Sequence, residues 1–348
     1  MRKNQEDKPV AESLLEEEDY VKIAKHIECF GIDEKVRKIQ ETIIQKGKGF
    51  DVLQFAICIS KSAENVDVTD MQNAIIKLHD SYLSYCFARD VVGADIKKLQ
   101  DAVIKSGDAT NIYRFARDVA GADVKALSKG MISYWWSPAY IYAFASKIKG
   151  ADITALSKAM NHFVECNNNK TYDAGYYIYK FAKEIKGANI NELQDAICKT
   201  GDSRYIYEFA KDIAEANAKT LSLCMKADCN PEYIYKFAKE IKDANVIALS
   251  ESMAHSKNAQ YIYKFARDVE GARISTLQSA EIDTQCPEYI FKFARDVRYA
   301  DIDILQSAIL GTWDREYIKK FAKEVKGANK NLVVNSGEEA LDELIQKL

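Results

Sequence analysis

The sequence lacks most of the features that assign a protein to a class at first sight. Only four of its 348 residues are proline, and no apolar run reaches the roughly 18 residues of a membrane-spanning helix. Its 49 basic residues nearly balance 52 acidic ones, and a formal net charge of −3 gives no overall polyanion-binding signature. The polar stretch MRKNQEDKPVAESLLEEEDY at the start has no apolar core of a signal peptide. We therefore expect a cytoplasmic protein that does not enter a membrane.

Catalytic and metal-binding motifs are missing as well. There is no Gly-rich phosphate loop, no G-x-S-x-G and no H-E-x-x-H. The eight cysteines include no C-x-x-C pair, and we expect them to be small buried apolar residues in a reducing compartment. His26 with Cys29, and His162 with Cys166, have helical spacing, but two ligands do not complete a metal site. We expect no enzyme activity, no cofactor and no metal.

What the sequence has is a 28-residue repeat. Position numbers within it run from the first residue of each copy. Phe stands at position 5 and Ala at positions 6 and 12 of all nine copies, and position 9 is always Ile or Val. The copies start at Leu83, Asn111, Tyr140, Tyr177, Tyr205, Tyr233, Tyr261, Tyr289 and Tyr317.

Each copy reads as two short helices. Apolar residues at positions 2, 5, 6, 9 and 12 follow the spacing of one helix face. Gly at position 11 of six copies favours the end of that helix, and Asp or Asn at position 13 favours the start of a second one that buries positions 14, 17 and 21. Helices this short are unstable alone, so stacking must bury their faces. The repeat predicts an all-α fold, a right-handed α-solenoid similar in architecture to HEAT and TPR arrays.

The copies divide the chain into three parts. Residues 1–80 are expected to form two divergent capping repeats, around Ile23-Ala24 and Phe55-Ala56. Residues 81–328 hold the nine copies, with an irregular insertion at 161–175. Residues 329–348 are expected to form a capping helix, with Ser336 and Glu339 as its capping box.

The segments YKFAKE, YRFARD and FKFARD carry a resemblance to a known group. Over about residues 80–328 the chain resembles the two-helix tandem repeats of roughly 28 residues found in many bacteriophage and bacterial proteins. The resemblance implies a binding scaffold and transfers no catalytic residue. It names no partner.

Breaks in the repeat indicate where a partner binds, because packing alone does not explain them. The copy at Asn111 ends in MISYWWSPA, and the copy at Tyr140 carries the insertion NHFVECNNNKTYDAG. The third tryptophan occupies the corresponding loop of a later copy. Exposed aromatic residues commonly anchor interfaces. The partner-binding candidates are Trp135, Trp136, His162, Phe163, Tyr172 and Trp313; each tryptophan folding over its neighbouring helix is the alternative.

Basic residues at positions 4 and 7 would form a ridge along the first helices. The polyanion-binding candidates are Lys180, Lys183, Lys236, Lys239, Lys264, Arg267, Lys292 and Arg295. Position 8 is nearly always acidic, so a solvated face of ion pairs between repeats is the competing interpretation. Tyrosines at positions 1 and 3 either stack bases or pack with a polar tip.

Three functions follow from these patterns. The first is a non-catalytic scaffold that captures another protein, which the phage-like resemblance narrows to an inhibitor acting by occlusion on a host defence or host enzyme, in the host cytoplasm. The alternative is a nucleic-acid or nucleotide binder that uses the basic ridge. A base-excising enzyme would need a carboxylate in an aromatic cleft, and the sequence singles out none.

Overall fold

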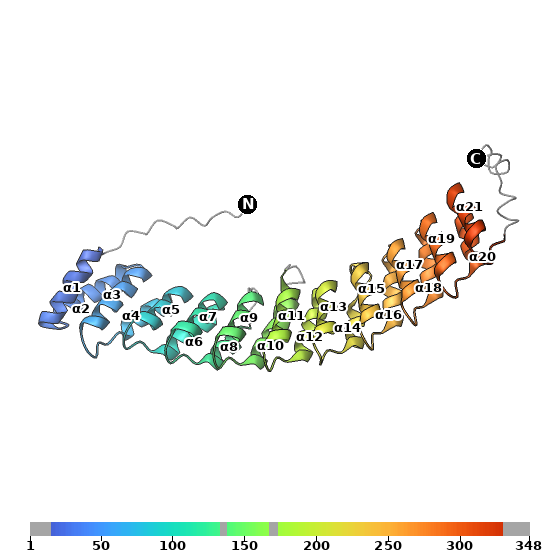
Figure 1. The fold of residues 1–348 in the computed structure, drawn as a ribbon. Helices are drawn as coiled ribbons and strands as arrows, with labels where there is room; N and C mark the ends of the chain where they lie inside the picture. Colours follow the sequence, from blue (N-terminus) through green and yellow to red (C-terminus); the bar gives the residue numbers. More distant parts are fainter. Residues whose placement is uncertain (1–14, 133–137, 167–172, 330–348) are drawn as a thin grey trace. The chain divides into compact units, whose positions relative to one another are not determined.

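The fold of the described residues is entirely α-helical. The computed structural model describes residues 15–132, 138–166 and 173–329, and in that part it has 21 α-helices and no strand (Figure 1). Its internal contacts divide the chain into two units. The N-terminal unit comprises Met1–Asn168 with Ile185–Asn189, and the C-terminal unit comprises Asn169–Glu184 with Ile190–Leu348. The predicted all-α class is confirmed.

The helices follow one another in pairs. Those of the N-terminal unit are α1 (Glu17–Phe30), α2 (Glu34–Lys46), α3 (Gly49–Ser62), α4 (Thr69–Lys77), α5 (Ser81–Asp90), α6 (Ile96–Ser106), α7 (Ala109–Asp118), α8 (Val124–Gly130), α9 (Pro138–Lys147) and α10 (Ile153–Cys166). Those of the C-terminal unit are α11 (Ala174–Glu184), α12 (Ile190–Thr200), α13 (Ser203–Asp212), α14 (Ala218–Cys224), α15 (Pro231–Glu240), α16 (Val246–His255), α17 (Ala259–Asp268), α18 (Ile274–Asp283), α19 (Pro287–Asp296), α20 (Ile302–Gly311) and α21 (Arg315–Glu324).

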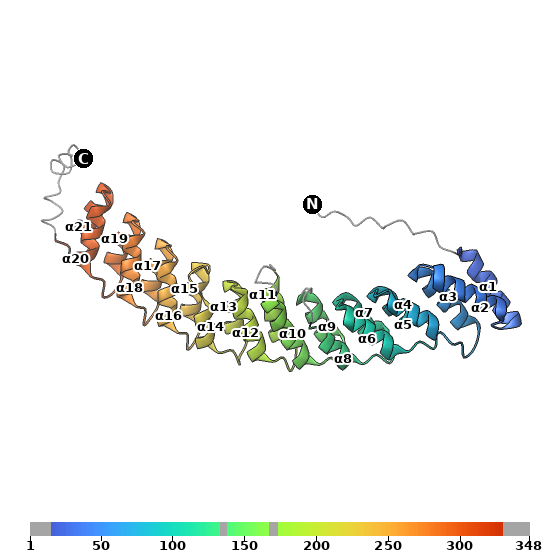
Figure 2. The same cartoon turned by 180° about the vertical axis from the view of Figure 1, so that it is seen from behind.

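Within each unit the helix pairs stack one on the next. In the C-terminal unit the first helices, α11 to α21, contact one another in sequence, and so do the second helices, α12 to α20. Figures 1 and 2 show these two rows from opposite sides, from yellow-green to red. The N-terminal unit stacks its pairs in the same manner, and the first two pairs, α1–α2 and α3–α4, lie where divergent capping repeats were expected. The handedness expected for the array stays a prediction.

The core consists of the residues that define the repeat. The position-5 Phe is completely buried in all nine copies, and so are the eight leucines at position 17. Burying each of these side chains contributes roughly 1.5–3 kcal/mol. Position 14, expected to be buried, is only half-buried, because it begins the second helix beside the turn. The sequence therefore located the core at positions 5 and 17 and overestimated the burial of position 14.

The turn between the two helices of a copy uses an unusual backbone conformation. Eight of the nine residues at position 11 have positive φ, which glycine adopts at little cost. Asp243 and Tyr299 adopt it without being glycine, at φ 62° and 67°. Glu215 is the exception, and its turn belongs to the copy that starts at Tyr205.

A second repeated contact involves a buried polar residue at position 18. Its side-chain oxygen accepts a hydrogen bond from the backbone N–H of position 13 in the next copy, at 2.7–3.2 Å. The pairs are Gln100–Asp123, Ser128–Asp152, Ser157–Asn189, Gln194–Asn217, Ser222–Asn245, Ser250–Arg273, Gln278–Asp301 and Gln306–Asn329. We call this the Gln/Ser ladder. It fixes the register of successive second helices, and the sequence analysis missed it.

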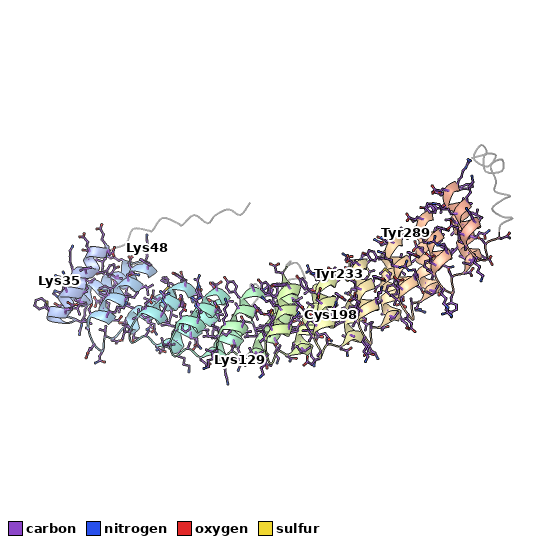
Figure 3. All side chains as sticks on the ribbon, viewed as in Figure 1. Lys35, Lys48, Lys129, Cys198, Tyr233 and Tyr289 are labelled. Carbon is purple, nitrogen blue, oxygen red and sulfur yellow. A yellow bond between two sulfur atoms is a disulfide. The ribbon has the colours of Figure 1, made fainter. Side chains whose placement is uncertain are left out.

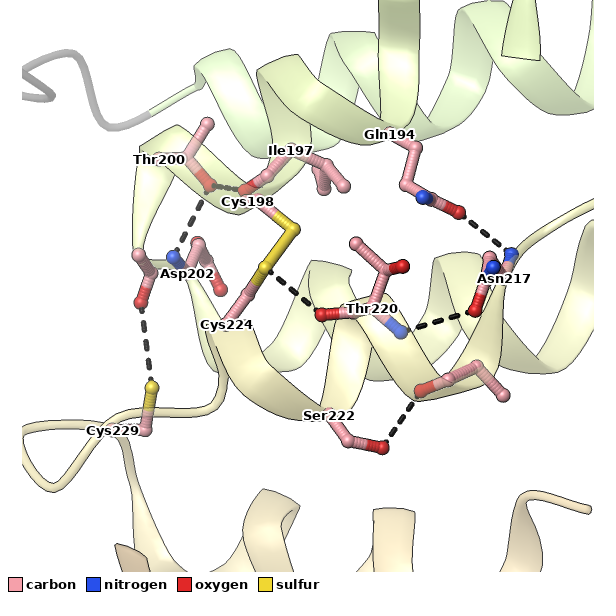
Figure 4. The surroundings of a disulfide bond; sticks show 12 residues. Gln194, Ile197, Cys198, Thr200, Asp202, Asn217, Thr220, Ser222, Cys224 and Cys229 are labelled. Carbon is pink, nitrogen blue, oxygen red and sulfur yellow. Dashed lines mark hydrogen bonds between the residues drawn. A yellow bond between two sulfur atoms is a disulfide. The ribbon is translucent and has the colours of Figure 1, made fainter. Parts of the chain in front are cut away.

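The cysteines correct one expectation. Cys198 of α12 and Cys224 of α14 form a disulfide, with their Cα atoms 5.3 Å apart (Figure 4). Both side chains are half-buried near the surface, while the other six cysteines are unpaired. The expectation that all eight are reduced is therefore wrong for this pair.

Two expected elements lie outside the described residues. Residues 330–348 hold almost all of the expected C-terminal capping helix, so that helix stays a prediction. Of the expected insertion at 161–175, residues 161–166 extend α10, and 167–172 fall outside the description.

Candidate interaction surface

Five tyrosines at position 3 link their first helix to the next one. The phenol hydroxyl of each of these five donates a hydrogen bond to the position-8 carboxylate of the following copy, at 2.5–2.7 Å. The pairs are Tyr85–Asp118, Tyr179–Asp212, Tyr207–Glu240, Tyr235–Asp268 and Tyr263–Asp296. We call this row the tyrosine ladder. Its rings also approach the position-1 tyrosine of the next copy, as in Tyr207 and Tyr233, whose centroids are 6.0 Å apart.

The basic residue at position 7 completes each rung of the tyrosine ladder. Lys211 lies over the ring of Tyr207 and donates hydrogen bonds to its hydroxyl oxygen and to Glu240, at 2.8 and 3.1 Å. Arg267 lies over Tyr263 in the same way and pairs with the neighbouring Asp268 at 2.6 Å. Hydroxyl, cation and carboxylate thus satisfy one another between stacked copies.

The ionisation of these groups follows from their contacts. The hydrogen bond from Arg117, with a smaller contribution from Tyr85, lowers the pKa of Asp118 to about 2. Burial and the bond to Asp296 raise the pKa of Tyr263 above its usual value. The carboxylates therefore stay charged and the phenols stay neutral throughout the neutral pH range. The tyrosine ladder is structural, and its hydroxyls point to carboxylates of the same chain.

The polyanion-binding candidates are engaged in these contacts. At position 7, Lys183 and Arg295 pair with carboxylates, Arg267 does so as described, and Lys239 donates to the hydroxyl of Tyr235. At position 4, Lys236 and Lys292 pair with the glutamate four residues earlier.

The position-4 lysines also lie over tyrosine rings. Lys236, Lys264 and Lys292 lie 4.8–5.2 Å from the ring centroids of Tyr233, Tyr261 and Tyr289, and Lys180 lies 5.6 Å from that of Tyr176. Figure 3 labels Tyr233 and Tyr289 on α15 and α19. The ridge exists, and five of its eight cations pair with a carboxylate of the same chain.

Three of the six partner-binding candidates lie within the described residues. Trp135, Trp136 and Tyr172 lie outside the described residues. Phe163 is only 3% exposed, so it belongs to the core of α10 and cannot anchor a partner. His162 lies on the same helix, 3.5 Å from the sulfur of Cys166 and 3.8 Å from Glu165. Trp313 is 48% exposed, with φ 61°, between α20 and α21.

A groove of about 720 Å³ lies in the C-terminal unit between the turn after α13 and the turn after α15. Ala218 lines it, in the place where the seven other copies described there carry Ile or Val. Ile241 lies in the same groove and is half-buried, whereas position 9 is buried in seven of the nine copies. Ala218 has less apolar volume than the Ile or Val of the other copies, although Ile185, in a copy without this change, is also half-buried. We call this feature the Ala218 groove.

Charges of both signs surround the Ala218 groove. Lys211, Lys219 and Lys242 line it together with three carboxylates, those of Glu215, Glu240 and Asp243. The unusual turn at Glu215, the position-11 residue without positive φ, forms part of its wall.

Two exposed apolar residues follow on the second helices beside this groove. Leu223 of α14 is 62% exposed and Ile247 of α16 is 55% exposed. Leu223 is at position 19 of its copy and Ile247 is at position 15 of the next. Positions 15 and 19 are four apart, so they lie on the same face of every second helix. Position 15 is Lys219 in α14 and Ser275 in α18, and position 19 is Glu251 in α16 and Ser279 in α18. The apolar residues are therefore local departures from a polar face.

Comparison with known proteins identifies no family for this chain. No protein-family model matches the chain, and no curated protein is similar to it in sequence. In the part of the chain that the structure describes, no three His, Cys, Asp or Glu side chains gather as a metal site. No helix among those residues is long and apolar enough to cross a membrane.

Proposed function

We propose that the protein is a non-catalytic scaffold that captures another protein at the C-terminal unit. The observation that carries the proposal is the Ala218 groove, where the repeat leaves an apolar floor uncovered. Leu223 and Ile247 extend the apolar surface onto the neighbouring second helices. Apolar anchors within a charged rim are the usual composition of protein–protein interfaces.

The charges favour a protein partner over a nucleic acid. A phosphate backbone binds where cations are available to replace its counterions. The lysines and arginines of the ridge are already paired with carboxylates or lie over tyrosine rings. The groove itself presents three carboxylates beside its three lysines, so its lining has no excess of positive charge.

The mechanism follows from a rigid surface without chemistry of its own. A partner held against stacked helices is covered over the area of contact, and its own ligands are excluded from that area. Occlusion of this kind is how an inhibitor of a host defence or host enzyme acts, and we propose this role on the strength of the phage-like repeat.

The proposal is tested by capture with the full-length protein. The immobilised chain is incubated with a native lysate treated with nuclease and washed at about 0.5 M salt, which removes contacts that depend on phosphate charge. The expected result is a stoichiometric protein whose affinity falls at least about tenfold for Ala218→Ile, because this change fills the groove with the side chain that other copies carry.

A matched pair of variants controls for surface charge. Leu223→Lys is expected to weaken capture, whereas Ser279→Lys places the same charge at the same position of α18 and is expected to leave it unchanged. Bound nucleic acid without protein, lost on replacing Lys236 and Lys264 by Glu, would instead establish the polyanion alternative.

A further inference from the structure

The Cys198–Cys224 disulfide lies at a contact that the repeat itself creates. Cys198 is position 22 of its copy and Cys224 is position 20 of the next one. Position 20 is small throughout the described copies: Ala102, Gly130, Ala159, Ala196, Cys224, Ser252, Ala280 and Ala308. In the N-terminal unit the same register packs Gly130 so tightly that a Cβ there would lie 3.0 Å from Ile104 side-chain carbons. Helix stacking therefore brings Cys198 and Cys224 together in either oxidation state.

The bond fastens a helix that ends early. α14 has seven residues, whereas α12 has eleven and α16, α18 and α20 each have ten. Its last residue is Cys224, and the next residue, Met225, leaves the helical conformation with ψ 78°. At the other end of α14 the Asn217 N–H is held by Gln194 of the Gln/Ser ladder. The Gln/Ser ladder thus holds the start of α14, and the disulfide holds its end.

The two sulfurs differ from the neighbouring thiol in accessibility. Cys198 and Cys224 are half-buried residues. Cys229 is nearby along the chain, but it is buried, and burial raises the pKa of its thiol to about 11. A thiol in that state supplies little thiolate to attack a disulfide. Cys229 (Figure 4) is therefore a poor nucleophile for opening the bond.

We propose that Cys198 and Cys224 form a reversible redox-modification site, which a dithiol reductant opens to release the end of α14 and residues 225–230. A thiolate of the reductant attacks one sulfur, breaks the S–S bond and forms a mixed disulfide, and the other cysteine leaves as a thiolate that takes up a proton. The second thiol of the reductant then displaces the protein thiol, which leaves two cysteine thiols and an oxidised dithiol. Two electrons and two protons pass to the protein, and a disulfide oxidant reverses the step.

The inference goes beyond the binding role and does not depend on it. The pair bonds because the repeat register places it, which is the requirement for a selective switch. Disulfides in reducing compartments are commonly transient and responsive in this way.

The test uses the full-length protein and dithiothreitol as the dithiol probe. Differential alkylation followed by mass spectrometry is expected to show Cys198 and Cys224 blocked in the oxidised protein and free together after reduction. Hydrogen exchange is expected to accelerate at least about tenfold in residues 221–230 on reduction, and to stay unchanged in the equivalent residues 249–258. Re-oxidation is expected to restore the slow rate.

A double variant supplies the matched control. Cys198→Ile with Cys224→Ala recreates the pair Ile282 and Ala308, which occupies the same positions in α18 and α20. This variant is expected to exchange slowly with or without dithiothreitol. Thiols already free in the absence of reductant, or a bond that opens only when the whole chain unfolds, would overturn the proposal. Unchanged exchange in the reduced wild-type protein would do the same, and that measurement needs no variant to fold.

Discussion

The helix hairpins at residues 205–232 and 261–288 both depart from the repeat. The first departs at surface positions and the second at a core position. The first keeps its core, with Phe209 and Leu221 completely buried, and changes its surface at Ala218, Leu223 and Cys224. The second keeps its surface pattern and changes its core, because Glu281 occupies position 21, which is Val, Ile or Met in the seven other copies described there.

The difference shows two consequences of breaking a repeat. Changes at exposed positions leave the stacking intact and create new surface, so they are where a partner is expected to bind. Glu281 is 0% exposed, one of its carboxyl oxygens has no hydrogen-bond partner, and the other is 3.4 Å from the hydroxyl of Thr284. Glu281 therefore adds no exposed surface, and its buried carboxyl group destabilises the helix pair that contains it.

The largest effect is expected from removing Glu281. Burial raises the pKa of its carboxyl group from 4.5 to about 8. Between these pH values the folded chain holds a proton that the unfolded chain has lost, so stability falls as pH rises, by roughly 5 kcal/mol up to pH 8. Glu281→Met is expected to abolish this fall, as measured by urea unfolding between pH 5 and 9.

An exposed glutamate of the same hairpin provides the control for this prediction. Glu270→Met removes a carboxylate at the turn after α17 and is expected to leave the pH dependence as in the wild type. A wild-type unfolding midpoint that stays constant from pH 5 to 8 would show that Glu281 is not protonated in the folded chain.

The Gln/Ser ladder offers a smaller test in the other hairpin. Ser222 accepts from the Asn245 N–H at 2.9 Å, and Ser222→Ala leaves this half-buried donor without its partner. The expected loss is about 1–3 kcal/mol in the free energy of unfolding. Ser279→Ala, at an exposed position of α18, is expected to change stability little. Equal losses for the two variants would mean that the ladder contributes nothing to register.

The tyrosine ladder gives the smallest expected effect, and it spans both hairpins. Tyr207→Phe and Tyr263→Phe each remove one hydroxyl bond to a carboxylate, with an expected cost of about 1 kcal/mol. Phe291 occupies the same position naturally, so both variants are expected to fold. A thermal melt with no shift for either variant would show that the cation and carboxylate of each rung suffice without the hydroxyl.

Much of the fold was readable from the sequence because it depends on residues that recur. Phe at position 5 and Leu at position 17 located both helices and the core between them. The polar contacts were not readable in the same way. Asp118 and Tyr85 are 33 residues apart, and only stacked copies reveal that they meet.

The candidate surface was predicted less well. Irregular length directed attention to Trp135, Trp136 and the loop around Tyr172, which lie outside the described residues, and to Phe163, which is buried. Ala218, Leu223 and Glu281 lie in copies of normal length, so a search for irregular length passed over them. Comparing the copies position by position would have found all three.

The Gln/Ser ladder also bears on how such an array changes its length over generations. Each copy supplies one acceptor to its successor and one backbone donor to its predecessor, and glutamine and serine serve equally as the acceptor. Duplication or loss of a whole copy in the gene therefore leaves every donor with a partner. The insertion in the copy that starts at Tyr140 lies outside the ladder and keeps the Ser157–Asn189 pair, whereas an insertion that displaces a second helix would leave an N–H unpaired. The array is thus free to evolve in steps of one helix pair, and its reach can be matched to a partner by recombination alone.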